Sequence, residues 1–216
     1  MLTATGITKR YGTLEVLRGI DIDIAGRSVT SIVGPSGAGK TTLLQILGTL
    51  DRPDSGRVMW QDTDVFSLGD ARLSQFRCDH IGFVFQLHRL LPEFTLEENV
   101  AMPALIRGRS RGEALADARR LLARLGLEAR ASHRPDQLSG GECQRGAVAR
   151  ALINRPAAVL ADEPSGSLDS RNRRELHRLF FELRDELGVT FLIVTHDDNL
   201  AADSDRVITL KDGLIV

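Results

Sequence analysis

The segment GPSGAGKTT, residues 34–42 of this 216-residue chain, constrains the fold more than any other. It places Gly34, Gly39, Lys40 and Thr41 at the spacing of a phosphate-binding loop. Glycines allow backbone conformations that other residues avoid, so successive N–H groups of the loop can converge on one anion. Lys40 is then placed to reach the β- and γ-phosphates, and the Thr41 hydroxyl to bind Mg²⁺. The sequence therefore predicts a nucleoside triphosphate site.

The residues on both sides of the loop fit a strand that leads into a helix. Residues 29–33 have the composition of a buried strand, and residues 42–47, TLLQIL, have a helical pattern. The helix N-terminus adds about half a positive charge beside the loop. An idle glycine-rich turn would need neither flank, so the context favours phosphate binding.

Short apolar runs later in the chain predict an α/β core. Residues 81–85, 157–161 and 190–195 are nearly all apolar, as expected for parallel strands that are covered on both faces. Segments with leucines at helical spacing separate them, such as residues 115–125 and 176–187. Strands that alternate with helices predict a three-layer core around a parallel sheet.

The N-terminal part has the alternating pattern of an antiparallel sheet. Apolar and polar residues alternate over residues 2–8 and 20–24, and Val58 and Trp60 continue the pattern. At the other end of the chain, ITLKDGLIV predicts a small hairpin around Asp212 and Gly213.

We expect a single domain over residues 1–216. Its core would comprise residues 1–86 and 156–216. The segment from about 87 to 155 is mostly helical and interrupts the alternation of strands and helices. We therefore interpret it as an inserted helical subdomain.

Composition excludes several classes of protein. Charged residues make up 26% of the chain but the formal net charge is −1, which gives no electrostatic case for binding nucleic acid. Cys78 and Cys143 are far apart and fit neither a zinc site nor a disulfide framework, as in a reducing compartment. The sequence has no secretory signal and no window of 18 apolar residues. We expect a cytoplasmic chain, and any membrane spans would belong to a separate polypeptide.

Two carboxylates follow the run at residues 157–161. Parallel sheets bind ligands at the carboxyl ends of their strands, where Asp162 and Glu163 would project. Asp162 is placed to hold Mg²⁺, and Glu163 to orient or deprotonate an attacking water. A phosphate loop alone leaves kinases, GTPases and transport ATPases open, so further motifs must decide between them.

The segment LSGGE, residues 138–142, opens a predicted helix. Ser139 is a good N-cap, and Gly140 and Gly141 would let a phosphate approach the exposed N–H groups. Taken alone, this segment would be only a capped helix.

The chain as a whole resembles an ATP-binding cassette (ABC) ATPase, and LSGGE resembles the signature motif of that family. The resemblance implies that Tyr11 stacks on adenine and that Gln86 contacts Mg²⁺ and senses the γ-phosphate. It implies also that His196 contacts the γ-phosphate and that residues 167–169, Ser-Leu-Asp, cross a dimer interface. Tyr11, Gln86 and His196 each have a plain alternative: a surface aromatic, a solvated strand end and an exposed histidine.

In the family two cassettes pair head to tail, so that each ATP lies between the phosphate loop of one copy and the signature motif of the other. The resemblance therefore implies a Mg²⁺-dependent ATPase that works as a homodimer, with Lys40, Glu163 and His196 as catalytic residues and Thr41, Gln86 and Asp162 as metal ligands. The full set of expected nucleotide-binding residues is Tyr11, Gly34, Pro35, Ser36, Gly37, Ala38, Gly39, Lys40, Thr41, Thr42, Gln86, Ser139, Gly140, Gly141, Glu142 and Asp169.

Residues 85–106 resemble the corresponding run of lipoprotein-releasing ATPases within the family. ATPases of macrolide export and ATP-dependent signalling modules of cell division are close alternatives. In the family this region receives a cytoplasmic helix of a transmembrane subunit, so we expect a peripheral protein on the cytoplasmic face of the inner membrane. Leu90, Leu91, Phe94 and Leu96 would be exposed until that helix docks.

Three positions depart from the pattern of these relatives: Asp62, Cys143 and Gly146. None is adjacent to a predicted catalytic group. Gly146 lies inside a predicted helix, which it should weaken by about 1 kcal/mol relative to alanine.

Overall fold

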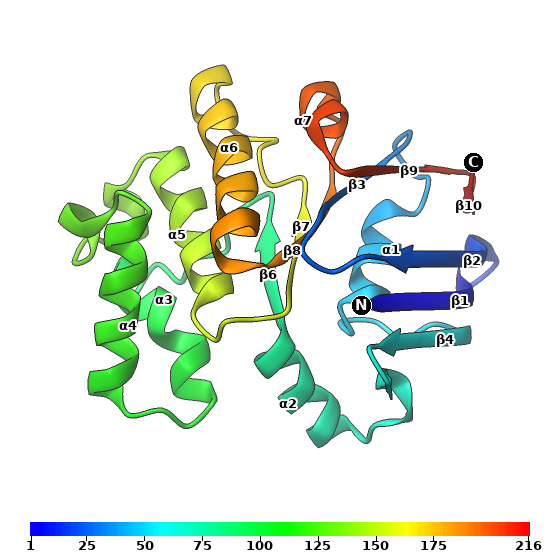
Figure 1. Ribbon diagram of the computed structural model, residues 1–216, viewed down its shortest axis with the longest axis horizontal. Helices are drawn as coiled ribbons and strands as arrows, with labels where there is room; N and C mark the ends of the chain where they lie inside the picture. The colour runs from blue at the N-terminus through cyan, green and yellow to red at the C-terminus, as the bar shows by residue number, and fades with distance from the viewer.

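A computed structural model describes residues 1–216, and its strands form two sheets (Figure 1). The N-terminal sheet is antiparallel, with strand order β2-β1-β4-β5. Its strands are β1 (Leu2–Tyr11), β2 (Leu14–Ile24), β4 (Ser55–Trp60) and β5 (Thr63–Asp64). The alternating pattern in the sequence predicted this sheet correctly.

The central sheet has six strands in the order β10-β9-β3-β8-β7-β6. Only the terminal hairpin β9–β10 pairs antiparallel, around the predicted turn at Asp212 and Gly213. The strands are β3 (Val29–Val33), β6 (Ile81–Phe85), β7 (Ala158–Asp162), β8 (Thr190–Val194), β9 (Arg206–Lys211) and β10 (Leu214–Ile215). The predicted parallel strands are confirmed, with ends shifted by one residue in β7 and β8.

Seven α-helices surround the sheets. Three of them, α3, α4 and α5, begin with capping boxes, in which a Thr or Ser N-cap exchanges hydrogen bonds with a Glu three residues later. The helices are α1 (Lys40–Leu47), α2 (Asp70–His80), α3 (Leu96–Ile106), α4 (Arg111–Arg124), α5 (Gly140–Leu152), α6 (Ser170–Leu187) and α7 (Asp198–Asp203). Short 3₁₀ turns are η1 (Val65–Ser67), η2 (Glu128–Arg130) and η3 (Pro135–Gln137). No helix is both long and apolar enough to cross a bilayer.

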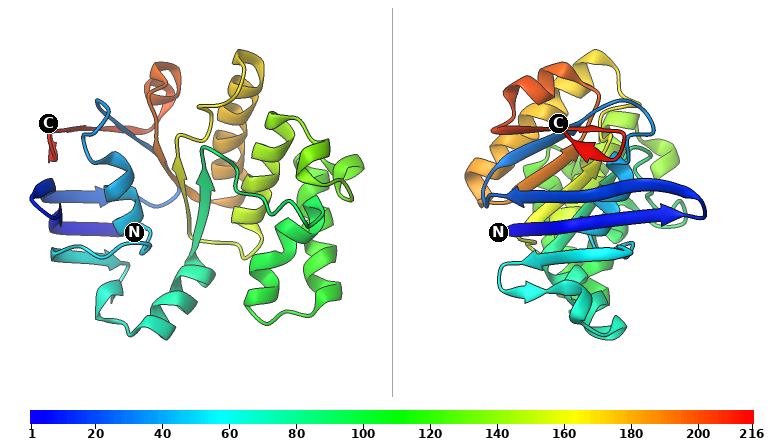
Figure 2. Two further views of the ribbon diagram at one scale, coloured as in Figure 1. Left: turned by 180° about the vertical axis from the view of Figure 1, so that it is seen from behind. Right: turned by 90° about the vertical axis from the view of Figure 1, so that its right-hand side faces the viewer.

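The central sheet is covered on both faces, which explains why its strands are apolar throughout. In β8, Phe191 and Ile193 belong to the core that includes α5 and α6, whereas Leu192 and Val194 belong to the core with α1 and the N-terminal sheet. Figures 1 and 2 show α3 and α4 at the end of the molecule away from the N-terminal sheet. The boundaries of the helical subdomain remain a prediction.

Helix α5 packs closely on both the central sheet and α3. A Cβ atom at Gly82 in β6 would overlap the carbonyl group of Ala151, and one at Gly146 would overlap a methyl group of Leu96. Gly146 is therefore more than the weak point that helix propensity predicts, because the helix packing leaves no room for a side chain there.

The exposure predicted for the segment after β6 is only half correct. Leu91 and Phe94 are 42% and 38% exposed, as predicted. Leu90 and Leu96 are buried, so for them the prediction was wrong. Leu96 opens α3 against Gly146, and Leu90 joins the same core.

Candidate nucleotide-binding site

The phosphate loop joins β3 to α1 and lies tightly against two strands. Gly34 has φ 146°, and a Cβ atom there would overlap the carbonyl oxygen of Leu210 in β9. Gly39 has φ 100°, and its Cβ atom would lie 2.9 Å from the carbonyl oxygen of Val16 in β2. Only glycine fits both positions, because each needs a positive φ and a close backbone approach.

Helix α1 begins with donors that the chain itself leaves unpaired. Its N-cap, Gly39, has no side chain to accept a hydrogen bond, and no acidic residue lies in the first turn. The first N–H groups of a helix have no partners within the helix, and they carry about half a positive charge. The Lys40 ammonium donates to the carbonyl oxygens of Gly34 and Pro35, at 2.8 and 3.0 Å. The loop thus presents a concave, positive surface that fits a phosphate group.

Three strands end side by side next to this loop. Phe85, Asp162 and Val194 are partners in the register of β6, β7 and β8, so the residues after them meet at one edge. The hydroxyl of Thr41 donates to the Asp162 carboxylate at 3.1 Å. Burial raises the pKa of Asp162, and Glu163 adds to the rise, while the bond from Thr41 opposes it. A half-buried carboxylate in this position is stabilised by a cation.

Glu163 has an unusual backbone conformation for a residue with a side chain. Its φ is 47°, and its N–H donates to the carbonyl oxygen of Val194 at 2.9 Å. Its carboxylate lies 2.6 Å from Nδ1 of His196, which follows β8. Strained backbone persists where the surrounding structure fixes it, and it concentrates at functional sites. The carboxylate and the imidazole thus form one pair at the edge of the sheet.

Lys40, Thr41 and Glu163 line a cavity of about 430 Å³, and Asp162 and His196 are bonded to Thr41 and Glu163 of its lining. The phosphate loop forms its floor, Glu163 and Val194 lie on one side, and Tyr11 with neighbouring apolar residues of β2 closes the outer end. The structure therefore brings together the predicted loop residues, Thr41, Asp162, Glu163, His196 and Tyr11.

The predicted signature segment does not line this cavity. Ser139 caps α5, with its hydroxyl 2.8 Å from the Glu142 carboxylate, which also accepts from the Ser139 N–H. A Cβ atom at Gly141 would overlap the side chain of Asn172 in α6. Asp169 caps α6 and accepts from the N–H groups of its first turn. One chain alone therefore does not join the two halves of the predicted site.

Gln86 also lies outside the cavity. It follows β6, is exposed, and packs against Gly166, where a Cβ atom would lie 2.9 Å from its amide nitrogen. The carbonyl oxygen of Gln86 accepts a 3.4 Å bond from Ser167. The loops after β6 and β7 are thus in contact, so a shift of one would displace the other.

A family model described as ABC transporter matches residues 17–166 of the chain. The chain belongs to the ABC transporter family. "Lipoprotein-releasing system ATP-binding protein LolD" of Porphyromonas gingivalis is 59% identical over 100% of this chain and 98% of its own length. The protein of the same name from Bacteroides thetaiotaomicron is 60% identical, over 100% and 99%.

Solved ABC cassettes have the same fold. The "dimeric structure of a post-hydrolysis state of the ATP-binding cassette MJ0796 bound to ADP and Pi" superposes with a TM-score of 0.91 at 39% identity. The match covers 100% of this chain and 96% of that one. The ABC fold and the ATPase activity expected from the sequence are therefore confirmed.

Two residues that support this ABC site were missed in the sequence. Asp51 accepts a 2.6 Å bond from the hydroxyl of Tyr11, and Arg130 pairs with Glu142 at 2.8 Å. The bond from Arg130 and those from Ser139 outweigh burial and lower the pKa of Glu142 to about 2. No local pattern reveals Asp51, which lies in another element from Tyr11.

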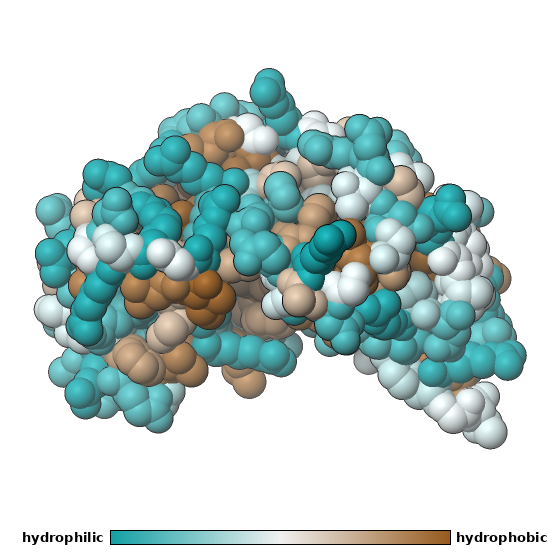
Figure 3. All heavy atoms as spheres, turned by 90° about the horizontal axis from the view of Figure 1, so that it is seen from below, coloured by the Kyte–Doolittle hydropathy of each residue, from teal (hydrophilic) through white to brown (hydrophobic).

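A groove of about 440 Å³ lies between α2, β6 and the ends of α3 and α5. Figure 3 shows apolar side chains near the middle of the face seen from below, between α3 and α4 on the left and the N-terminal sheet on the right. Apolar lining residues include Leu50, Phe85 and Ile106. The groove also contains the guanidinium groups of Arg77, Arg89 and Arg150 but no acidic side chain.

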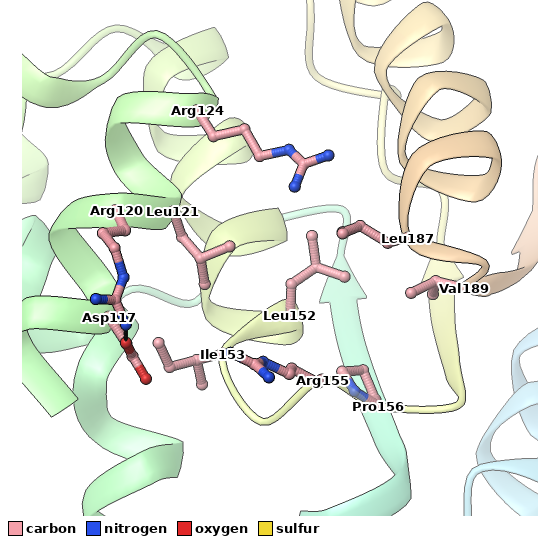
Figure 4. A pocket seen from close by; sticks show the side chains of 10 residues that line it. All are labelled: Asp117, Arg120, Leu121, Arg124, Leu152, Ile153, Arg155, Pro156, Leu187 and Val189. Atoms are coloured by element: carbon pink, nitrogen blue, oxygen red, sulfur yellow. Dashed lines mark hydrogen bonds and ion pairs between the residues drawn. The ribbon is translucent and has the colours of Figure 1, made fainter. Parts of the chain in front are cut away.

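Another cavity, of about 400 Å³, lies between α4 and the ends of α5 and α6 (Figure 4). Its wall contains leucines together with Arg120 and Arg124, which pair with Asp117 and Glu186. None of its lining residues belongs to the predicted nucleotide site.

Proposed function

We propose that the chain is the ATP-hydrolysing subunit of a system that releases lipoproteins from a bacterial inner membrane. The observation that carries the ATPase mechanism is a cavity lined by the phosphate loop and Glu163, with Asp162 bonded to Thr41 and His196 paired with Glu163. Relatives named for lipoprotein release are 59% and 60% identical over the whole chain, which supports lipoproteins as the cargo. They favour this function over macrolide export and over signalling in cell division.

Catalysis in this site would rest on positioning and on charge. Lys40 and the N–H groups of the loop would hold the β- and γ-phosphates and stabilise the negative charge that moves during phosphoryl transfer. Glu163 would orient the attacking water and accept its proton. His196, 2.6 Å from Glu163, would keep that carboxylate in place and contact the γ-phosphate.

The donor set fits Mg²⁺. Thr41 and Asp162 present a hydroxyl and a carboxylate within 3.1 Å, and Mg²⁺ prefers such oxygen ligands together with phosphate oxygens. Burial raises the pKa of Asp162, as expected for a carboxylate that a bound cation would stabilise. Thr41 and Asp162 would hold the ion, with Gln86 joining from the adjacent loop. The bound ion would neutralise charge on the phosphates.

The working form would be a head-to-tail homodimer. Ser139, Gly140, Gly141, Glu142 and Asp169 lie outside the cavity of their own chain and would complete the site of a second copy. Solved cassettes of similar fold are described as dimeric, which supports a pair. A two-fold pair of this kind uses the same surface of both copies.

Separate transmembrane subunits would dock in the groove near residues 86–106. Exposed Leu87, Leu91 and Phe94 leave apolar surface beside it. The arginine side chains of the groove repel one another. Burial lowers the pKa of Arg150, and the positive charge of Arg89 lowers it further. An apolar helix that carries an acidic residue would complement both features. The protein would thus be peripheral on the cytoplasmic face of the inner membrane.

A pull-down with the Glu163→Gln variant tests this function. The variant is incubated with ATP and detergent-solubilised native membranes, and the membrane subunits that it captures are identified. These subunits are then reconstituted with the wild-type chain in liposomes. Release of a lipoprotein to a soluble acceptor, dependent on ATP hydrolysis, is the expected result. Hydrolysis without release, or capture of a subunit that releases no lipoprotein, would contradict the assigned cargo.

A further inference from the structure

Asp51 connects the aromatic end of the nucleotide cavity to the helix that carries the phosphate loop. Its carboxylate accepts a 2.6 Å bond from the Tyr11 hydroxyl, a 2.8 Å bond from the Lys9 ammonium and a bond from the N–H of Arg52. Lys9 is buried and also donates to the carbonyl oxygen of Arg52 at 2.6 Å. The carboxylate thus holds both side chains at the end of β1.

Asp51 is itself fixed to the C-terminal end of α1. The N–H groups of Leu50 and Asp51 both donate to the carbonyl oxygen of Gln45, at 2.8 and 3.3 Å. The other end of α1 is the phosphate loop. A rigid helix therefore sets the distance between the group that holds Tyr11 and the N–H groups that would hold phosphate.

The Tyr11 ring has Lys9 over one of its faces. Lys9 lies over the ring, with its ammonium 5.1 Å from the ring centroid. Tyr11 is 48% exposed and lines the outer end of the nucleotide cavity. A ring held at its hydroxyl and covered on one face loses little freedom when a base stacks on the other.

We infer that Asp51, with Lys9, is a positioning residue that orients Tyr11 for the base of the nucleotide. The inference rests on the proposed stacking of Tyr11 on adenine. Lys9 and the Arg52 N–H hold the Asp51 carboxylate, and its bond from the Tyr11 hydroxyl fixes the ring in advance, so the ring need not be ordered at the moment of binding. Asp51 itself touches no reacting atom.

The charges in the cluster agree with this role. Hydrogen bonding to Asp51 raises the pKa of Tyr11, so the hydroxyl stays protonated and continues to donate. Burial would raise the pKa of Asp51, but the bonds from Lys9, Tyr11 and the Arg52 N–H outweigh it and hold the pKa below its ordinary value. The carboxylate therefore remains an acceptor at neutral pH.

The test compares two probes, ATP and tripolyphosphate, each with Mg²⁺, on the full chain by calorimetry. Tripolyphosphate has the phosphates but no base, so it reports the loop alone. Tyr11→Phe removes the hydroxyl but leaves the ring and the pair between Lys9 and Asp51. Asp51→Asn removes the charge, and the double variant combines both. Asp23→Asn, at the far end of the same sheet, is the matched control.

Both single variants should weaken ATP binding about three- to tenfold, as expected when one side chain has to be ordered on binding. Tripolyphosphate binding should not change, and the double variant should be no weaker than the weaker single variant. If Asp51→Asn does not fold because Lys9 is left unpaired, Tyr11→Phe still gives the result. ATP binding by Tyr11→Phe equal to wild type, or equal losses for both probes, would overturn the inference.

Tyr11→Ala separates this inference from the proposed function. It should weaken ATP binding about tenfold or more, because a stacked base contributes roughly 1–3 kcal/mol. If it weakens ATP binding while Tyr11→Phe does not, the stacking stands and the role of Asp51 is overturned. If Tyr11→Ala also binds ATP normally, the stacking itself is wrong.

Discussion

The phosphate loop and the signature segment both lead into a helix with a glycine-rich N-terminus, but they treat its N–H groups differently. Helix α1 begins at Gly39, which offers no side-chain cap. Helix α5 begins at Ser139, whose hydroxyl accepts from the N–H of Glu142 in a complete capping box. The first terminus has no side-chain cap, whereas at the second the N–H groups of Ser139 and Glu142 are already paired within the chain.

The charges in the first turns of α1 and α5 also differ. No acid lies in the first turn of α1, and Lys40 adds a positive charge there. The first turn of α5 contains Glu142, whose carboxylate is neutralised by Arg130 at 2.8 Å. The phosphate loop therefore suits an anion by itself, and we propose that the signature segment adds weaker contacts once a second copy has approached.

The largest effect should come from Lys40→Ala. Without the ammonium, charge on the transferring phosphoryl group is poorly stabilised, and ATP hydrolysis should fall about 10²- to 10³-fold, by analogy with deleted oxyanion donors. Steady-state phosphate release measures this. Lys211→Ala, an exposed lysine outside the site, is the control. Near-normal hydrolysis by the Lys40 variant would show that the loop is not the main phosphate site.

Replacing a glycine by alanine should lower the free energy of unfolding much more in the phosphate loop than in the signature segment. A methyl group at Gly34 would overlap the carbonyl of Leu210 at a φ of 146°, so Gly34→Ala should destabilise the fold by roughly 2–3 kcal/mol. At Gly140 the nearest atom would lie 3.7 Å away, so Gly140→Ala should change stability by less than about 0.5 kcal/mol. Urea unfolding of both variants measures this, and equal losses would contradict the described packing.

Ser139→Ala should have a smaller effect on turnover than Lys40→Ala. Loss of the cap should cost about 1 kcal/mol of stability, and loss of the trans contact should slow hydrolysis about tenfold, as for one hydrogen bond to a charged group. Mixed with the Lys40 variant, it should form dimers with one intact composite site. Recovery of activity on titrating one variant into the other measures this; no recovery would argue against sites shared between copies.

The smallest effect concerns the pH dependence of the α5 cap. The pKa of Glu142 is lowered to about 2 by Arg130 and Ser139, from an ordinary value of 4.5. Such a carboxylate stabilises the fold above pH 4.5, and the stabilisation is lost as pH falls toward 2. The Glu142→Gln variant keeps the capping box with Ser139, but its side chain cannot ionise. Between pH 6 and pH 4, wild type should lose more thermal stability than this variant; parallel losses would contradict the assignment.

Local patterns predicted most of the fold. The loop at residues 34–42, the apolar strands and the capped start of α5 all depend on neighbouring residues, so the sequence displays them directly. The buried positions of Leu90 and Leu96 were not predicted, because they depend on how α3 meets α5. Gly146 likewise has a packing role that helix propensity cannot reveal.

In the candidate site, too, local features could be predicted from the sequence and contacts between distant segments could not. Asp162 and Glu163 could be predicted because they end and follow an apolar strand, whereas His196 was predicted from the resemblance to the family. The bond between Tyr11 and Asp51 joins two elements 40 residues apart, and no periodicity in the sequence relates them. Interactions that define the pocket edges thus needed the folded structure.

The most direct test of the central claim, that one chain holds only half of each site, is the mass of the Glu163→Gln variant in solution. Light scattering would be recorded without nucleotide and with saturating ATP and Mg²⁺. Because this variant should bind ATP without hydrolysing it, the account predicts a monomer that becomes a stable dimer with ATP, and a weaker dimer when the Ser139→Ala change is combined with it in one chain. A variant that binds ATP and stays monomeric would contradict the account.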